Sequence, residues 1–424
     1  MKKLVFLTII LLSLFRLQAQ VTLDDCQRKA RANYPLIKQY ELINAVKKYN
    51  IAQIHKAYLP QFSLGGRVTW QSDVTEFPEA FTGLLDLLDA SITFPGQDQY
   101  LFSAELSQTV WDGGITTMQK KMVAAQHEVE QQNLEVTFYT LNEQINQLFF
   151  SILLLKEQLI QNVLLQEELE RNQILVASYM ENGIAQQSDL DEIKVEILSV
   201  QQRNIEITTT KKSLLKVLGA FIGEKIPEEA TFVKPPAALD TEKEINRPEL
   251  KLFDSQVSLF RIQGEQLWSK GMPRVALFAK GAYGNPGLNM FESGFTPYFI
   301  GGVQLAWNFG GFYTNRDEKR LLENQKSQVE VQREVFLFNL NQEISQKDDE
   351  IEKLRDLLQN DDEIIRLRES VQRSSEVKVE SGTMSVSDLM RDIHATAMAR
   401  QTKAWHEIQL LNAVWQRKLM TNDQ

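Results

Sequence analysis

The chain has little cysteine and histidine, and it has no surplus of positive charge. Cys26 is the only cysteine among 424 residues, so a disulfide within the chain is excluded. The formal net charge is −10 at pH 7, which makes the chain a poor candidate for binding nucleic acid. The four histidines are scattered without metal-ligand spacing, and we expect packing or surface roles for all of them: His55, His127, His394 and His406.

The sequence also lacks the short motifs that accompany common enzymatic chemistry. It contains no Walker phosphate loop, no dinucleotide-binding glycine fingerprint and no Gly-x-Ser-x-Gly nucleophile elbow. Acidic residues are plentiful, but a charge run such as KDDEIEKLRD at 347–356 usually marks a solvated face. We therefore expect no catalytic residue, no cofactor and no metal, and an enzyme is the least favoured function class.

Residues 1–19 have the pattern of a secretory signal peptide. Two lysines precede an apolar run at 4–15, and Ala19 offers a small residue for cleavage. The run is too short to span a bilayer as a helix, and no second stretch of about twenty apolar residues is expected, so the mature chain should have no helical membrane span. Cys26 follows two aspartates instead of closing the apolar run, which argues against a lipid anchor.

Glycine and proline are missing from three long segments, residues 115–182, 312–381 and 383–424. Apolar residues recur there with helical spacing, and the first segment would extend for roughly 100 Å as one unbroken helix. A long dimeric coiled coil is one interpretation. However, strict heptads are not sustained and apolar residues cover more than one face, which favours helices packed between two neighbours in a ring or bundle.

Glycine-rich segments between these helices alternate apolar and polar residues with period two. The pattern predicts four strands in two hairpins, at about 60–72, 99–111, 274–284 and 298–308. Eleven residues at about 3.3 Å each, tilted by about 40°, span roughly 28 Å, which matches the apolar band of an outer-membrane barrel. A small soluble sheet covered by the helices is the alternative interpretation.

The strand pattern also bears on assembly. Four strands cannot close a barrel, and an open edge in lipid leaves backbone groups unpaired, so separate chains would have to share one barrel. Symmetry favours a ring. The polar strand faces, with Glu105, Lys280 and Gln304, would line a wet lumen, and the opposite faces would meet lipid.

One ten-residue motif occurs twice, as ENGIAQQSDL at 181–190 and ESGTMSVSDL at 380–389. The glycines, Gly183 and Gly382, suggest a left-handed turn position, and the Ser and Asp that follow suggest a helix start. Each copy of the motif therefore predicts the tip of a helical hairpin.

The duplication extends over the whole mature chain. NYPLIK at 33–38 is repeated as NRPELK at 246–251. We predict two tandem units of helix, strand, strand, long helix, turn and helix, at 20–222 and 246–424, joined by a proline-containing linker at 223–245.

In this order and doubled spacing, the motifs resemble the TolC-like outer-membrane efflux proteins. They include YLPQFSLGG at 58–66, WDGG at 111–114 and the repeated Gly-x4-Ser-Asp-Leu tip. The resemblance covers essentially the mature chain. It implies a mainly α fold with a membrane β-barrel portion: a homotrimer whose twelve-stranded barrel in the outer membrane continues into a periplasmic α-helical barrel.

The resemblance also implies the function. The chain would be the passive exit duct of a tripartite efflux or type I secretion system, with a periplasmic adaptor, an inner-membrane transporter and outer-membrane lipid as partners. Adaptor docking is expected at the tips, near Gly183 and Gly382. A non-conducting periplasmic scaffold of long helices is the alternative, and only the channel needs strands with one apolar face.

The resemblance further places an acidic constriction at the periplasmic entrance, formed by Asp189 and Asp388. Arg391 stands where the family's pattern has a second acid. Val379 and Met384 stand where the family has the tyrosine and arginine of its gate lock, so the gating contact differs in this chain.

A capping role competes with the constriction. Ser385 as an N-cap would place Asp388 in the first helical turn, and Ser188 would do the same for Asp191. A carboxylate in that turn stabilises a helix by about 0.3–1 kcal/mol.

Overall fold

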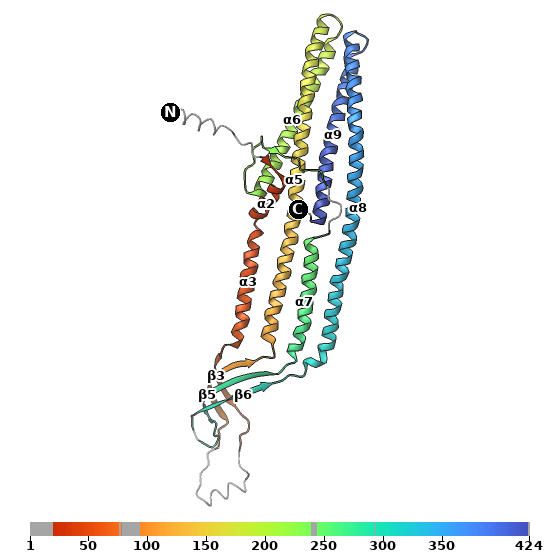
Figure 1. Cartoon of the computed structure of the whole chain (residues 1–424). Helices are drawn as coiled ribbons and strands as arrows, with labels where there is room; N and C mark the ends of the chain where they lie inside the picture. The colour runs from red at the N-terminus through yellow and green to blue at the C-terminus, as the bar shows by residue number, and fades with distance from the viewer. Residues whose placement is uncertain (1–19, 76–77, 79–93, 239–243, 293, 423–424) are drawn as a thin grey trace, which may run out of the picture. The chain divides into compact units, whose positions relative to one another are not determined.

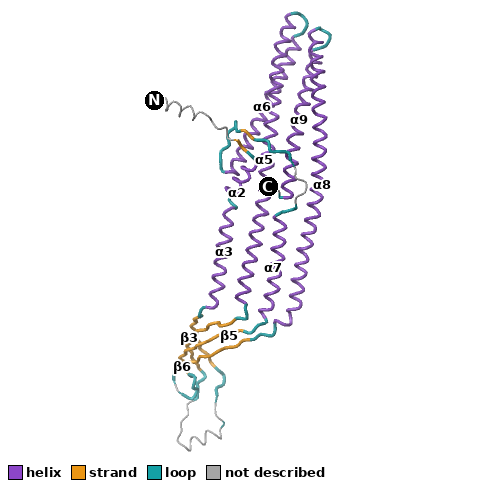
Figure 2. The backbone as a smooth tube through the Cα atoms, viewed as in Figure 1, coloured by secondary structure: helices purple, strands orange, loops and turns teal. Residues whose placement is uncertain are grey.

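The computed structural model describes residues 20–75, 78, 94–238, 244–292 and 294–422 (Figure 1). The predicted signal peptide lies outside the described residues, as does most of the connection between the first two strands. Most described residues are helical, as Figure 2 shows. The helices are α2 (Leu23–Asn33), α3 (Ile37–His55), η1 (Lys56–Tyr58), α5 (Ile115–Glu181), α6 (Gln187–Ile222), α7 (Pro248–Lys270), α8 (Gly311–Glu380) and α9 (Val386–Thr421). The strands are β1 (Gln20–Val21), β2 (Gln61–Trp70), β3 (Asp98–Trp111), β4 (Thr231–Phe232), β5 (Arg274–Asn285) and β6 (Thr296–Ala306).

The chain divides into two compact units, and the long helices α5 and α8 run through both. The strand unit comprises residues 42–131 and 253–331. The helical unit comprises the residues up to 41, those at 132–252 and those from 332 on. The order helix, strand, strand, long helix, helix occurs twice along the chain. The repeat boundaries and the linker at 223–245 stay predictions.

The strand unit contains one antiparallel sheet with the order β2-β3-β5-β6 (Figure 1). The register pairs Glu105 with Lys280 across β3 and β5, and it pairs Gln304 with Ala276 across β5 and β6. Because directly opposed residues share a face and side chains alternate along each strand, Glu105, Lys280 and Gln304 all lie on one face. The sheet therefore groups the three residues that the sequence assigned to a lumen.

The other face of the sheet is apolar and open. Nine of its large side chains are between 47% and 75% exposed: Phe62, Leu64, Val68, Trp70, Phe102, Leu277, Phe299, Val303 and Leu305. An exposed apolar surface of this extent marks an interaction or membrane surface. Within the described residues of the strand unit, these side chains stay exposed and are not covered by a helix.

The helical unit contains two hairpins, α5 with α6 and α8 with α9 (Figure 1). All four helices contribute to one apolar cluster at the turns, which we call the tip core. Its buried members are Leu169, Val176, Tyr179, Leu190, Ile193, Ile197, Val200, Val379, Val386, Leu389, Met390 and Ile393. Because most stability of a helix in a protein comes from packing an apolar face, this core holds the ends of both hairpins together.

The repeated asparagines of NYP and NRP occupy matching positions in the helical unit. Asn33 donates from its side-chain amide to the carbonyls of Ala220 and Phe221 at the end of α6. In the second half, the N–H of Asn246 donates to the carbonyl of Thr421 at the end of α9. Carbonyls at a helix C-terminus lack partners within the helix, so each contact satisfies groups that would otherwise be unpaired.

The helical unit also contains a small parallel sheet, in which β1 pairs with β4. Phe232 of β4 is 5% exposed and lies 5.2 Å from Phe149 of α5, centroid to centroid. Lys234 forms ion pairs with Glu157 of α5 at 3.0 Å and with Glu407 of α9 at 3.3 Å. The segment between the two halves is thus attached to helices of both halves.

One helix has a composition that bears on the expectation of no helical membrane span, which stays a prediction. Helix α5 contains an 18-residue window with a mean hydropathy of 1.5, which is apolar enough by length and composition to cross a membrane. A core helix can have the same composition, and α5 buries Phe149, Ile152 and Leu153 almost completely. These three residues pack inside the helical unit, although only 28% of the apolar window is buried.

Candidate functional site

The first hairpin tip is a Schellman turn. Gly183 has a φ of +74°, and its N–H donates to the carbonyl of Met180 at 3.1 Å. The N–H of Ile184 donates to the carbonyl of Tyr179 at 2.8 Å. Paired bonds of this kind, closed by a left-handed glycine, terminate a helix and reverse the chain.

The second tip repeats the same turn. Gly382 has a φ of +68°, and its N–H donates to the carbonyl of Val379 at 2.9 Å. The N–H of Thr383 donates to the carbonyl of Lys378, also at 2.9 Å. A Cβ on Gly183 or Gly382 would meet no atom within 4 Å, so the positive φ alone explains the glycine. The two copies of the motif encode one turn twice.

The start of α6 differs from the sequence prediction. Ser188 was expected to be the N-cap, but Gln186 occupies that position with φ −106° and ψ 163°. The carboxylate of Asp189 reaches back to accept from the N–H of Gln186 at 2.7 Å. This bond fixes the helix start two residues earlier, because it satisfies a donor that the helix leaves unpaired.

Asp191 therefore lies beyond the cap. It accepts from the side chain of Gln187 at 2.9 Å and forms an ion pair with Lys194 at 3.2 Å. The hydrogen bond from Gln187, together with Lys194, lowers the pKa of Asp191. Its contacts are those of an exposed helix surface.

The start of α9 agrees with the capping prediction. Ser385 is the N-cap, and its hydroxyl accepts from the N–H of Asp388 at 3.1 Å and donates to the carboxylate of Asp388 at 2.7 Å. Arg391 forms an ion pair with the same carboxylate. The charge of Asp388 is therefore already paired within its own helix. An acidic constriction formed by Asp189 and Asp388 stays a prediction.

Two contacts between the hairpins were missed by sequence reasoning. The hydroxyl of Ser387 on α9 donates to Glu192 on α6 at 3.2 Å. His394, also on α9, places Nε2 at 3.2 Å from Glu196 on α6. The two acids are four residues apart on α6 and so share a helix face, but nothing local in the sequence identifies their partners.

Val379 and Met384, the two residues that the resemblance assigned to the gate, are apolar and face the tip core. Val379 is 2% exposed and belongs to the tip core, and Met384 packs against that core. These side chains hold the two hairpins together by apolar packing, and Ser387 of α9 adds a polar contact with Glu192 of α6.

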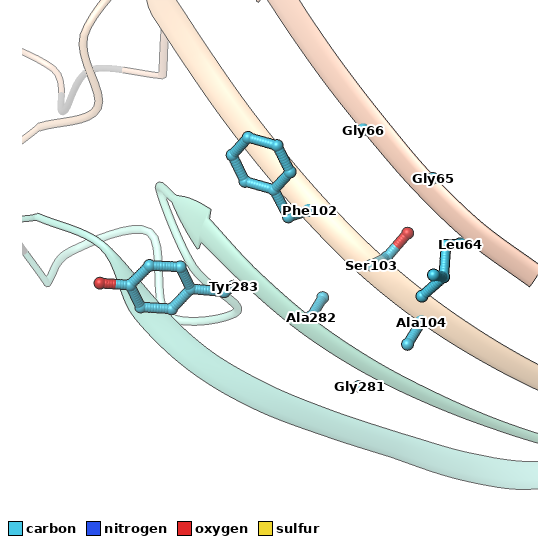
Figure 3. A pocket seen from close by; sticks show the side chains of 9 residues that line it. All are labelled: Leu64, Gly65, Gly66, Phe102, Ser103, Ala104, Gly281, Ala282 and Tyr283. Carbon is cyan, nitrogen blue, oxygen red and sulfur yellow. The ribbon is translucent and has the colours of Figure 1, made fainter.

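The sheet of the strand unit contains an open depression of about 620 Å³ (Figure 3). Figure 3 shows the rings of Phe102 and Tyr283 toward one end of it and Leu64 toward the other. Its remaining lining residues are Gly65, Gly66, Ser103, Ala104, Gly281 and Ala282. The lining contains no carboxylate, amine, imidazole or thiol, and its side-chain polar groups are the hydroxyls of Ser103 and Tyr283. Among the described residues, no cluster of three or more His, Cys, Asp or Glu side chains could hold a metal ion.

Comparisons with known proteins agree with this architecture. Residues 27–224 match the family model of the outer membrane efflux proteins. The fold is similar to that of a membrane protein from Pseudomonas aeruginosa, with a TM-score of 0.67 and 12% identity over 94% of this chain and 90% of the other. VceC from Vibrio cholerae matches with a TM-score of 0.63 and 12% identity over 92% and 95% of the two chains. The open state of the MtrE outer membrane channel from Neisseria gonorrhoeae matches with a TM-score of 0.65 and 12% identity over 95% and 89%.

No curated protein sequence matches the chain significantly. At 12% identity the solved structures show the fold alone, and the family model matches the first half of the chain, residues 27–224. That family consists of channel-forming efflux proteins and is not a family of enzymes. The resemblance inferred from the repeated motifs is therefore confirmed, as is the location in the outer membrane with an extension into the periplasm. The chain resembles the outer membrane efflux proteins, whose family model matches its residues 27–224.

Proposed function

We propose that this chain is one of three identical subunits of an exit duct for a tripartite efflux or type I secretion system. The observation that carries the proposal is the four-stranded sheet with one mainly apolar, exposed face. Strands β2 and β6 lie at its edges and have no strand partner on their outer sides among the described residues.

The edges require completion by other copies. An unpaired backbone group in lipid costs several kcal/mol, and only a closed sheet removes all free edges. Three sheets of four strands, the number that the family resemblance implies, make a barrel of twelve strands. The apolar face then meets lipid, and the polar face with Glu105, Lys280 and Gln304 lines the lumen.

Transport through this duct is passive. The sequence has no nucleotide-binding motif, so an inner-membrane transporter would supply the energy through a periplasmic adaptor. The polar lumen provides only a water-filled path along which solutes diffuse. The selection of substrate would be shared between the pump and the walls of the duct.

The oligomer and the pore can be tested together. We expect the mature protein, purified in detergent, to be a trimer by native mass spectrometry and to give stepwise conductances in planar bilayers. A stable, folded monomer that forms no pores would contradict the proposal, and it would favour a non-conducting periplasmic scaffold.

The hairpin tips are the proposed docking place of the adaptor. Both turns are exposed and lack bulky side chains at their glycines, and Ile184 beside Gly183 is 49% exposed. An adaptor's own hairpin could pack against such a surface. We expect cysteines introduced at Asn182 or Ser381 to crosslink to the adaptor in cells.

The native cysteine does not interfere with that experiment. Cys26 is 1% exposed, and burial raises the pKa of its thiol to about 12, so it stays unreactive. Ile205→Cys is a matched control, because Ile205 is 67% exposed on α6 but lies about 27 Å along the helix from its start. Crosslinks at Ile205 without crosslinks at either tip would show that docking occurs elsewhere.

A further inference from the structure

We propose that the strand-lined section of the duct favours anionic solutes, so that the substrates of this chain carry carboxylate or phosphate groups. The inference rests on the proposed function, because it takes the polar face of the sheet as the lumen wall. The strand register shows which charged residues lie on that face, and the proposal depends on their net charge.

Three cations and one carboxylate lie on the polar face. The register places Ser63 opposite Glu105 and Glu105 opposite Lys280, so all three share a face. By alternation, Arg67 on β2 and Arg274 on β5 lie on the same face. The residues of β6 on this face carry no charge. Three cations less one carboxylate leave two positive charges for each chain.

The cations of this face are not neutralised by close partners. Within the described part of the chain, neither Arg67 nor Arg274 forms an ion pair, and Lys280 forms none with Glu105 opposite it. Arg67 and Arg274 are exposed. Their charge therefore acts on the solution in front of the sheet and not on a buried acid.

The net positive charge of the polar face is opposite in sign to the net charge of the whole chain. The whole chain has a formal charge of −10, whereas three copies of the polar face would carry a net +6. Low-dielectric walls of lipid and protein focus such a field into the pore and raise the local concentration of the opposite ion. Rings of Arg and Lys side chains give pores that prefer anions.

A small hollow shows where an anionic group could rest. A depression of about 360 Å³ at the junction of strands and helices is lined by Arg274, Gln304, Thr109 and Gln119, among others. Guanidinium, amide and hydroxyl groups are the donors that a carboxylate or phosphate accepts from.

Asp112 also borders this hollow, and donors of the chain itself surround its carboxylate. It is 7% exposed, and its carboxylate accepts from the hydroxyl of Tyr58 at 2.8 Å and from the N–H groups of Gly114 and Thr116 at 2.9 and 2.7 Å. These hydrogen bonds stabilise the start of α5 and connect it to η1, the short helix that precedes β2.

Ion selectivity measures the proposal directly. Single channels of the full-length mature protein are recorded in planar bilayers across a KCl gradient, and the reversal potential gives the permeability ratio of chloride to potassium. We expect the variant with Arg67→Gln, Arg274→Gln and Lys280→Gln to lower this ratio by about two- to fivefold. Glu105→Gln is expected to raise it.

Matched controls separate charge from structure. Exchange of Arg67 and Arg274 for lysine, with Lys280→Arg, keeps the charge and should leave the ratio unchanged. The connection at 71–97 contains five acidic residues and no basic one, so the comparison uses shifts between variants and not the sign of the wild-type selectivity. Intact pores with the same ratio in the neutralised triple variant, or in Glu105→Gln, would overturn the anion proposal. A wild-type protein that forms no pores would instead overturn the proposed function.

Discussion

Val303→Arg is expected to abolish assembly of the protein in the outer membrane, whereas Gln304→Arg, one residue along the same strand, is expected to leave it intact. Val303 lies on the apolar face of β6 and is 67% exposed. An arginine facing lipid costs roughly 2–4 kcal/mol near the bilayer midplane, and three copies would lose roughly 6–12 kcal/mol for each trimer. Gln304 lies on the opposite face, where an added charge meets water.

The measurement is the amount of heat-modifiable oligomer in isolated outer membranes, with total protein as the reference. The two variants carry the same new side chain in neighbouring positions, so differences in synthesis or strand propensity are small. Equal loss in both variants would show that the two faces of the sheet have been assigned wrongly. Loss only in Gln304→Arg would reverse the assignment.

Ile193→Ala is expected to destabilise the hairpin tips by about 2–5 kcal/mol, the range observed for truncating a buried isoleucine or leucine. Ile193 on α6 is fully buried in the tip core, where helices from both hairpins meet. Removing three carbons leaves a cavity, and the four helices are too firmly packed to fill it completely. Because Val379 and Met384 supply apolar contacts in place of a polar lock, we expect loss of this packing to loosen the hairpins.

Limited proteolysis near the tips measures this effect, since cleavage requires local opening. Val195→Ala is the matched control: Val195 lies two residues along the same helix, is also β-branched, and is 60% exposed. We expect earlier cleavage of Ile193→Ala and little change in Val195→Ala. If the two variants are cleaved at the same rate, the tip core does not hold the hairpins closed.

The sequence by itself determined the long helices, the turns and the strands. Segments without glycine and proline became α5, α8 and α9, because nothing in them interrupts helical hydrogen bonding. Gly183 and Gly382 identified the turns, since a left-handed position nearly requires glycine. Period-two alternation located the strands because it reflects the pleat of the backbone, which is a local property.

Only the tertiary structure decided which distant residues meet. The common face of Glu105, Lys280 and Gln304 depends on strand register, and a shift of one residue would have moved a side chain to the other face. The contact between Ser387 and Glu192 joins positions 195 residues apart. Even the local choice of Gln186 over Ser188 as the cap of α6 depended on which donor Asp189 reached, because several side chains near a helix start compete for the same unpaired groups. Such choices are settled by three-dimensional proximity, which periodicity and composition do not encode.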